Sequence, residues 1–247
     1  MRYNPKKHRL PVCPAAGILL VDKPAMWTSF DVVNFIRARF NVPKVGHCGT
    51  LDPAATGLLV LVLGKFTSLS GKLSGEDKQY TGSMLLGVET DSGDLDGKVI
   101  NRSAVVPDAE QIKEAFAGFR GKSQQYPPMY SAVKVDGKKL YELARNGVEI
   151  EREARDINIS RLDITRMELP EVDFILDCSK GTYVRTLCSD IGKKLGCGGV
   201  LTQLRRTRCG KFLLQDAVEL NTLKNMEQDQ FTDMMAQKMV KMLEGIK

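Results

Sequence analysis

The residues best suited to chemistry stand in the stretch Gly46–Gly57, which reads GHCGTLDPAATG and contains the carboxylate of Asp52. Glycine adopts backbone angles that other residues avoid, and the proline after Asp52 biases that residue toward an extended conformation. The apolar run Leu58–Leu63 follows at once. We therefore predict a stiff loop that leads into a buried strand and holds Asp52 in a fixed pose. A single aspartate held in this way can act as a nucleophile toward a sugar or base carbon without a metal.

A simpler interpretation of the same stretch is a structural turn. Asp-Pro is a common start of a turn, and glycine-rich loops often stand before strands. Spacing alone favours the turn, so a catalytic role for Asp52 needs support from the rest of the chain.

Other kinds of catalytic site find little support. Gly64 and Lys65 are followed by Phe66, and Leu59 stands where a phosphate-binding loop needs a glycine. Only two histidines are present, His8 and His47, and there is no nucleophile elbow, which disfavours a Ser-His-Asp enzyme. The six cysteines are scattered, without the close pairs that zinc sites use, so we expect reduced thiols and no metal.

The acidic stretch Glu89–Gly97 invites comparison with a calcium loop, because acidic residues alternate before a glycine. Aligned on Gly97, the first and last ligand positions fall on Ser92 and Ser103, where an EF-hand needs acids. A polar hairpin loop between strands is the better interpretation.

Hydrophobic periodicity predicts an α/β or α+β fold, with a mixed, largely antiparallel sheet flanked by helices. Strands are expected at Gly17–Val21, Leu58–Leu63, Lys78–Gly87, Asp156–Met167, Val172–Cys178 and Leu201–Arg208. Helices are expected at Thr28–Phe40, Gly64–Leu73, Pro107–Phe119, Tyr183–Leu195, Asp216–Leu223 and Gln230–Leu243. Thr28 and Asp31 resemble a capping pair, and Trp27 beside them is expected to pack rather than to stack on a base.

We expect one catalytic domain over residues 1–247, with an inserted arm at about 121–157 and a short helical segment at about 216–247. Within the arm, Lys122–Lys139 combines aromatic with basic residues, a mixture that grips nucleic acid, although a proline-rich surface connection has the same composition. The arginines of Leu201–Arg208 are expected to line a surface that faces phosphates.

The overall composition suits a partner that carries phosphates. Lys and Arg outnumber Asp and Glu by 36 to 30, giving a formal net charge of +6. No apolar stretch approaches the ~20 residues that span a bilayer, and Met1–Pro14 has no apolar signal region. We expect a cytoplasmic protein that does not bind membranes.

Taken as a whole, the stretch around Asp52 resembles the catalytic signature of the TruB family of tRNA pseudouridine synthases. Further segments resemble the same family in matching order, from about Gly17 to Asp216: Gly17–Pro24, Lys78–Tyr80, the arm segment Tyr126–Lys134, Ser179–Leu187 and Leu201–Arg206. The resemblance implies the pseudouridine synthase fold. Family members often carry an additional C-terminal RNA-binding domain, which we expect to be absent here.

The resemblance also implies a reaction, the conversion of uridine 55 in the T-loop of tRNA to pseudouridine. The bond from the sugar to N1 breaks, the base turns and rejoins at C5, and no cofactor is needed. The target base must first leave its stack, at a cost of a few kcal/mol. Two alternatives stay open: a synthase acting on another RNA such as ribosomal RNA, and a non-catalytic tRNA chaperone. A monomer is expected.

Carried over by position, Asp52 matches the family's catalytic aspartate, Tyr80 the tyrosine that stacks on the flipped base, and Arg185 the arginine that pairs with the acid. Tyr183 matches a tyrosine that borders the pocket, and Leu204 an apolar residue that lines it.

Four further residues match family positions that lie near the substrate. His47 matches a histidine placed against the RNA loop. Lys23, Pro24 and Lys134 match positions near the active site or the RNA.

Overall fold

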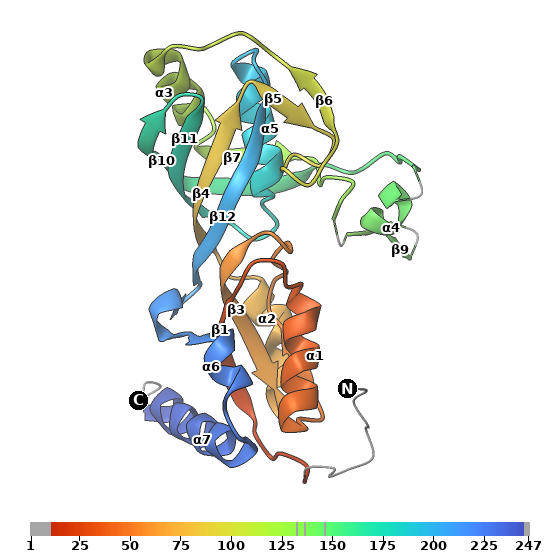
Figure 1. The fold of residues 1–247 in the computed structure, drawn as a ribbon, viewed down its shortest axis with the longest axis vertical. Coiled ribbons are helices and arrows are strands. Elements are labelled where there is room, and N and C mark those ends of the chain that lie inside the picture. The colour runs from red at the N-terminus through yellow and green to blue at the C-terminus, as the bar shows by residue number, and fades with distance from the viewer. Residues whose placement is uncertain (1–10, 132, 136, 146, 245–247) are drawn as a thin grey trace. The chain divides into compact units, whose positions relative to one another are not determined.

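The computed structural model describes residues 11–131, 133–135, 137–145 and 147–244, and they form two compact units. Unit 1 comprises the chain up to Glu76 and from Arg206 onward, and unit 2 comprises Asp77–Arg205 (Figure 1). The second boundary falls within strand β12 (Gly199–Cys209). Each unit is described by itself.

The sheet of unit 1 is built around two hydrophobic strands. Its strands are β1 (Gly17–Lys23), β2 (Val45–His47), β3 (Thr56–Leu63), the end of β12, β13 (Phe212–Leu213) and β14 (Val218–Glu219). β1 runs antiparallel to β3 along its whole length and parallel to β14, while β2 and β13 are antiparallel to β3 and β12. Alternate residues of a strand face opposite sides, so the apolar run of β3 can be buried on both faces of the sheet.

Helix α1 (Ser29–Phe40) covers one face of this sheet. It begins at Thr28, whose hydroxyl accepts from the Asp31 N–H while the Asp31 carboxylate accepts from the Thr28 N–H, the predicted capping pair. Its buried face packs on β1 and β3, and Phe40 stacks on Phe231 with ring centroids 3.9 Å apart. Phe30, although apolar, does not belong to this buried face and is exposed.

The other helices of unit 1 are short, apart from the last. They are the 3-10 turns η1 (Gly64–Leu69) and η2 (Leu214–Asp216), and the helices α2 (Ser70–Ser74), α6 (Leu220–Lys224) and α7 (Gln228–Glu244). Trp27 packs edge-on against Phe35 and lies under the Lys224 ammonium, which confirms it as a packing residue.

Unit 2 is organised around a second set of strands, in the order β12, β4, β11, β10, β7. Their bounds are β4 (Lys78–Leu86), β7 (Gly121–Gln125), β10 (Arg155–Glu168) and β11 (Glu171–Cys178), and β4, β11, β10 and β7 pair antiparallel. Helices α3 (Ala109–Ala117) and α5 (Val184–Lys194) belong to this unit. Two hairpins and a short helix complete it: β5 (Val88–Thr90) with β6 (Val99–Arg102), β8 (Lys134–Val135) with β9 (Lys138–Lys139), and α4 (Leu140–Arg145).

The predicted fold class is confirmed, since one parallel pair and several antiparallel pairs make a mixed sheet flanked by helices. The predicted hairpin loop Glu89–Gly97 does connect two strands, although its first two residues belong to β5. The prediction of a helix over Asp216–Leu223 was wrong in its first half, because the end of η2 and the strand β14 precede α6 there. Gly64–Leu73 begins as a 3-10 turn, and the start of the predicted arm is the strand β7. No helix among the described residues is long and apolar enough to cross a membrane.

Candidate active site

Asp52 lies in the loop between β2 and β3 of unit 1, and its side chain is half-buried. The loop leaves the sheet after Cys48, whose N–H donates to the Val60 carbonyl at 2.9 Å. Gly49 follows with φ of 108°, a conformation that side chains disfavour. After the acid, the Ala55 N–H donates to the Asp52 carbonyl at 3.1 Å and closes a tight turn. The predicted turn and the predicted rigid presentation of Asp52 are therefore the same structure.

Arg206 holds both ends of this loop. Its guanidinium donates to the carbonyls of Gly49 at 3.1 Å and Thr50 at 3.5 Å before the acid, and to Leu58 at 2.7 Å after it. The side chain is only 1% exposed. A planar group with several fixed donors can bridge carbonyls that lie on different chain segments, which a lysine cannot do in the same geometry.

The two neighbours of Asp52 in the chain are held from the start of α1. The Ser29 hydroxyl accepts from the Leu51 N–H at 2.8 Å and donates to the Leu51 carbonyl at 3.2 Å. On the other side, the Pro53 carbonyl accepts from the Met26 N–H at 2.8 Å and from the Lys23 ammonium at 3.2 Å. The backbone is thus fixed immediately before and after the catalytic candidate.

Lys23 is completely buried, and its ammonium also donates to the carbonyls of Trp27 at 2.6 Å and Pro24 at 3.0 Å. Burial lowers the pKa of Lys23 to about 8; the nearby Asp52 carboxylate opposes this shift and the Arg206 guanidinium adds to it. The prediction that Lys23 lies near the acid is consistent with this electrostatic contact within unit 1.

His47, at the end of β2, is half-buried, and burial lowers its pKa, with a smaller contribution from Arg206. The imidazole is therefore neutral at pH 7. Its Nδ1 is buried and has no hydrogen-bond partner among the described residues. Within unit 1, the structure thus places Asp52 in the loop after β2, His47 at the start of that loop, and Lys23 in contact with its backbone at Pro53.

In unit 2, Tyr80 lies on β4 opposite Leu176 of β11 and is 7% exposed. Leu204 lies half-buried on β12. Tyr183 stands just before α5, where the Gln125 side chain accepts from its N–H at 2.7 Å and donates to its carbonyl at 3.1 Å. Gln125 therefore fixes the backbone that carries Tyr183.

Arg185, in the first turn of α5, is 5% exposed. Its guanidinium donates to the Ser92 carbonyl at 2.9 Å and the Tyr130 carbonyl at 2.8 Å, and it lies 3.4 Å from the Asp94 carboxylate. Arg185 thus links α5 to the β5–β6 loop and to the arm. Its expected pairing with Asp52 stays a prediction, as does the approach of Tyr80, Tyr183 and Leu204 to the acid. Lys134 lies on β8, and its side chain is outside the described part of the structure.

Sequence reasoning missed the residues that support the site. Ser29, Gln125 and Arg206 act through the backbone of their neighbours, and a residue pattern does not show where free carbonyls lie. For Arg206 the expectation of a phosphate-facing side chain was wrong, because the side chain points into unit 1 and binds carbonyls. The sequence offered one indication that Arg206 is important, because this residue ends the segment Leu201–Arg206, which resembles the family.

Comparison with known proteins identifies the family. A sequence model described as "TruB family pseudouridylate synthase (N terminal domain)" matches residues 37–184, which include the Asp52 loop. The chain belongs to the TruB family. A second model, described as "tRNA pseudouridylate synthase B C-terminal domain", matches residues 185–245. This match covers most of α5, β12 and the helices α6 and α7, and our expectation about an additional RNA-binding domain stays a prediction.

TruB relatives are similar over most of their length. The tRNA pseudouridine synthase B of Opitutus terrae is 52% identical over 208 residues, covering 84% of this chain and 86% of that protein. That of Protochlamydia amoebophila is 48% identical over 217 residues, covering 86% and 82%. A chain in the crystal structure of a Cbf5-Nop10-Gar1 complex superposes with a TM-score of 0.67 and 29% identity, covering 89% of this chain and 59% of that one. The TruB assignment and the fold thus agree.

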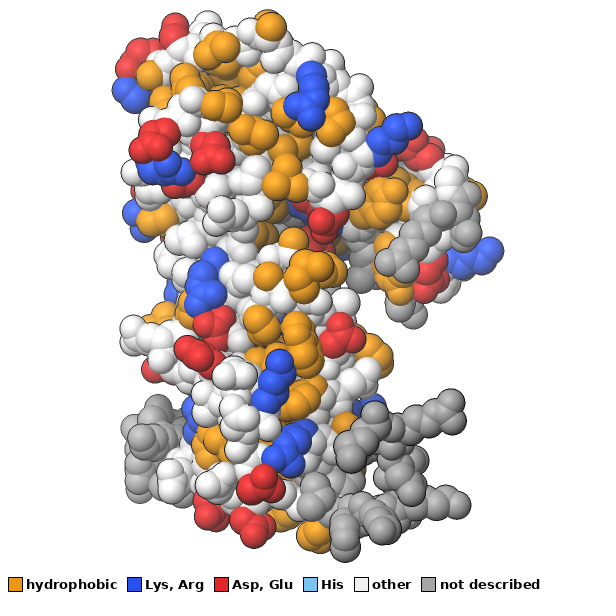
Figure 2. Space-filling model, in the orientation of Figure 1, with side chains coloured by type: hydrophobic (Ala, Val, Ile, Leu, Met, Phe, Trp, Pro, Cys, Tyr) orange, Lys and Arg blue, Asp and Glu red, His pale blue; other side chains and the backbone are white. Residues whose placement is uncertain are grey.

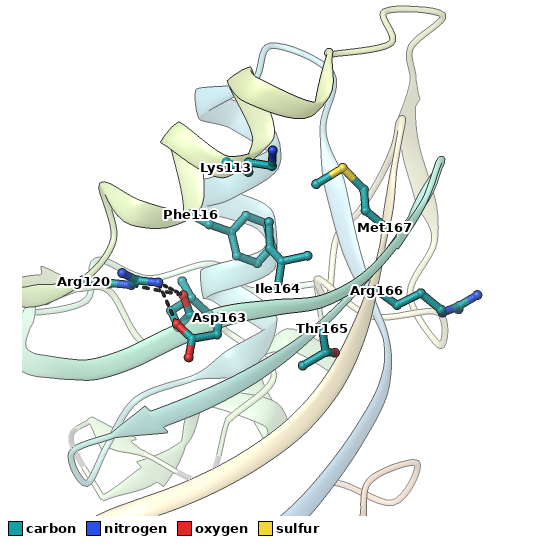
Figure 3. A pocket seen from close by; sticks show the side chains of 9 residues that line it. Lys113, Phe116, Arg120, Asp163, Ile164, Thr165, Arg166 and Met167 are labelled. Atoms are coloured by element: carbon teal, nitrogen blue, oxygen red, sulfur yellow. Dashed lines mark hydrogen bonds and ion pairs between the residues drawn. The ribbon is translucent and has the colours of Figure 1, made fainter.

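A cavity of about 460 Å³ lies elsewhere in unit 2 of this TruB protein, between α3 and β10 (Figure 3). Its lining consists of Lys113, Phe116, Arg120, Leu162, Asp163, Ile164, Thr165, Arg166 and Met167. Each cation is matched by a carboxylate: Lys113 by Glu110, Arg120 by Asp163, and Arg166 by Asp173, Glu168 and Glu171. None of the residues predicted for the active site lines this cavity.

Proposed function

We propose that this protein converts uridine to pseudouridine at position 55, in the T-loop of tRNA. The observation that carries the proposal is the fixed loop of Asp52, whose two chain neighbours and both ends are held by side chains from α1, β1 and β12. Family membership and relatives named tRNA pseudouridine synthase B support the same reaction and substrate.

In this reaction Asp52 is the nucleophile. Its carboxylate forms a bond to the substrate as the bond between the sugar and N1 breaks, and the freed base turns so that C5 faces the sugar. The new bond forms from C5, the proton on C5 leaves, N1 gains a proton, and Asp52 is released unchanged. Substrate and product are isomers, so no redox partner or cofactor is consumed.

The remaining site residues bind and orient the base. Tyr80 stacks on the flipped uracil and Tyr183 and Leu204 border it, which offsets part of the cost of taking the base out of its stack. Arg185 pairs with Asp52, which keeps the carboxylate ionised and aimed. The neutral His47 is an uncharged group for the RNA loop to pack against, while Lys23 fixes the turn after the acid.

The partner is the T-stem-loop of a tRNA, bound by a monomer in the cytoplasm. We assign the arm at about 121–157 to gripping this RNA, with Lys134 on its hairpin. One contact supports a defined position for the arm within unit 2, since Arg185 of α5 binds the Tyr130 carbonyl. A second contact holds the arm internally, since Arg152 donates to the Pro127 carbonyl at 3.2 Å. Tyr126, directly after β7, is exposed and is available to a base.

The Asp52→Asn variant tests the function. It keeps the size of the side chain but removes the nucleophile, so pseudouridine formation in an unmodified tRNA should fall by at least ~10³-fold while affinity for the T-stem-loop persists. The product is mapped to the nucleotide, and Asp216→Asn, which changes an exposed aspartate of the same unit, is the control.

The same experiment distinguishes the alternatives. Modification at other positions, or only in ribosomal RNA, would identify a different pseudouridine synthase. Binding of tRNA with no pseudouridine from the wild-type protein would identify a chaperone. Full activity in Asp52→Asn would refute the assignment of the nucleophile.

A further inference from the structure

The loop of Asp52 and the turn before α1 present an unusual group of exposed apolar residues. They are Pro24, Ala25, Met26, Phe30, Pro53 and Ala54, which we call the apolar rim. Met26 is 83% exposed and Phe30 is 61% exposed. Hydrophobic side chains gather over α1 on the visible face of the molecule (Figure 2). Single exposed apolar residues are ordinary, but a group of them beside a catalytic loop indicates a binding surface.

The two large side chains of the rim lie at or next to the hydrogen bonds that hold the chain neighbours of Asp52. Met26 donates its N–H to the carbonyl of Pro53, the residue after the acid. Phe30 follows Ser29, which holds Leu51, the residue before the acid. The rim and the acid are thus placed by the same hydrogen bonds in unit 1.

The backbone of Met26 gives a second, independent observation. Its φ is 66°, and apart from the glycines only Asn41, at 48°, shares a positive φ among the described residues. Asn41 ends α1, where asparagine commonly adopts this conformation, whereas methionine has no polar group to compensate for it. Glycine would fit the Met26 turn without strain. Strained residues that persist in a fold cluster at functional sites, so the side chain of Met26 is expected to serve a purpose.

We propose that Met26 and Phe30 bind the unstacked nucleobases that flank the target uridine in the RNA. This inference rests on the proposed function and adds a specific contact surface to it. The rim carries no charge, so it does not suit phosphates, whereas a polarizable thioether and an aromatic ring suit the faces of bases. When the target base flips out, its neighbours lose a stacking partner, and an apolar surface beside Asp52 replaces it.

The test compares affinities for a synthetic T-stem-loop RNA by fluorescence anisotropy. Met26→Gly should weaken binding by about 5-fold and Phe30→Ala by about 10-fold, the lower range for lost stacking on a base. Met26→Gly should also melt at the same or a higher temperature than the wild type, because it removes the strain. If Met26 had only a structural role, Met26→Gly could not lower RNA affinity while the melting temperature stays the same or rises. Asn41→Gly is the matched control, since it changes the other positive-φ residue at the far end of α1 and should leave affinity unchanged.

A second series identifies the part of the RNA involved. In these RNAs the nucleotide on one side of the target uridine lacks its base, and each RNA should bind the wild type more weakly. With the RNA that lacks the base contacted by Phe30, Phe30→Ala should no longer weaken binding. The dependence of affinity on salt should be the same for wild type and variants, because no phosphate contact is lost.

Three outcomes would overturn the proposal. One is unchanged affinity in both variants, the second is a salt dependence that differs from the wild type, and the third is a changed oligomeric state, which would assign the rim to a second copy of the chain. Pseudouridine formation by the wild type is measured in parallel, so that failure of the proposed function is seen separately from failure of the rim.

Discussion

Two arginines of this protein show how the same side chain serves different ends in its two units. Arg206 in unit 1 is buried and donates to three backbone carbonyls, of Gly49, Thr50 and Leu58. Arg166 in unit 2 has a side chain that is 42% exposed, and it forms ion pairs at 2.6 Å with Asp173 and Glu168 and at 3.3 Å with Glu171. By the number and length of ion pairs, Arg166 is the better bound of the two.

The difference in burial reverses that ranking. Ion pairs in contact with water are screened and gain little over hydration, even though the three carboxylates raise the pKa of Arg166. A buried guanidinium cannot return to water while the fold persists, so its hydrogen bonds to the carbonyls are not readily exchanged for bonds to water. The comparison indicates that a loop is held rigid by buried bonds to its backbone, not by the largest cluster of charges. Three predictions test this.

The largest effect is expected for Arg206→Met, which keeps the apolar stem and removes the donors. The carbonyls that Arg206 serves would lose its hydrogen bonds, so the free energy of unfolding should fall by about 3–5 kcal/mol. The loop of Asp52 would lose its position, and kcat for pseudouridine formation should fall by about 10²-fold or more, as expected for a small misplacement of a reacting group. Urea unfolding and single-turnover kinetics measure the two effects.

Arg206→Lys refines this prediction. A lysine keeps the charge but cannot bridge carbonyls before and after the acid, so stability should recover more than kcat. Arg37→Met, which removes an exposed arginine of α1, should change neither by a comparable amount. If Arg206→Lys restored kcat fully, charge rather than geometry would be the contribution of Arg206.

Local signals in the sequence were sufficient for much of the fold and for the tight turn that carries Asp52. Thr28 and Asp31 predicted the start of α1, because a capping pair depends on residues three apart, and the apolar run after Gly57 predicted β3. The strands β2 and β14 were missed, since two or three residues show no periodicity and pair only because β3 and β1 lie beside them. Arg206 was misjudged for the same reason: its partners are backbone groups distant in sequence, which side-chain pattern cannot reveal.

An intermediate effect on the free energy of unfolding is expected at Lys23. Its charge is buried like that of Arg206, but a lysine can lose its charge by releasing a proton. The folded protein lowers the pKa of Lys23 from 10.5 to about 8, so between these values the unfolded chain binds more protons than the folded one. Stability contributed by this site therefore rises with pH from about 8 to about 10.5, and below pH 8 the charged form carries its full burial cost.

The measurement is urea unfolding of the wild type and of Lys23→Met at several pH values across this window. The wild type should gain stability relative to the variant as pH rises, by up to about 3 kcal/mol, because the variant has no proton to lose at this position. Since Tyr, Cys and other Lys residues titrate in both proteins, the difference isolates Lys23. A difference that is flat or falls across the window would show that burial does not disfavour the charged form.

The smallest effect is expected for Arg166→Gln, at the cavity between α3 and β10. The variant leaves Glu168, Glu171 and Asp173 without their common cation, yet water reaches this cluster and screens their repulsion. The urea midpoint should shift by much less than in Arg206→Met, the shift should shrink further in about 1 M salt, and pseudouridine formation should be unchanged. Unfolding at low and high salt, with Arg161→Gln as a neighbouring exposed arginine of β10 for control, measures this. A loss of stability equal to that of Arg206→Met would mean that exposed charge clusters, and not buried bonds to the backbone, dominate in this protein.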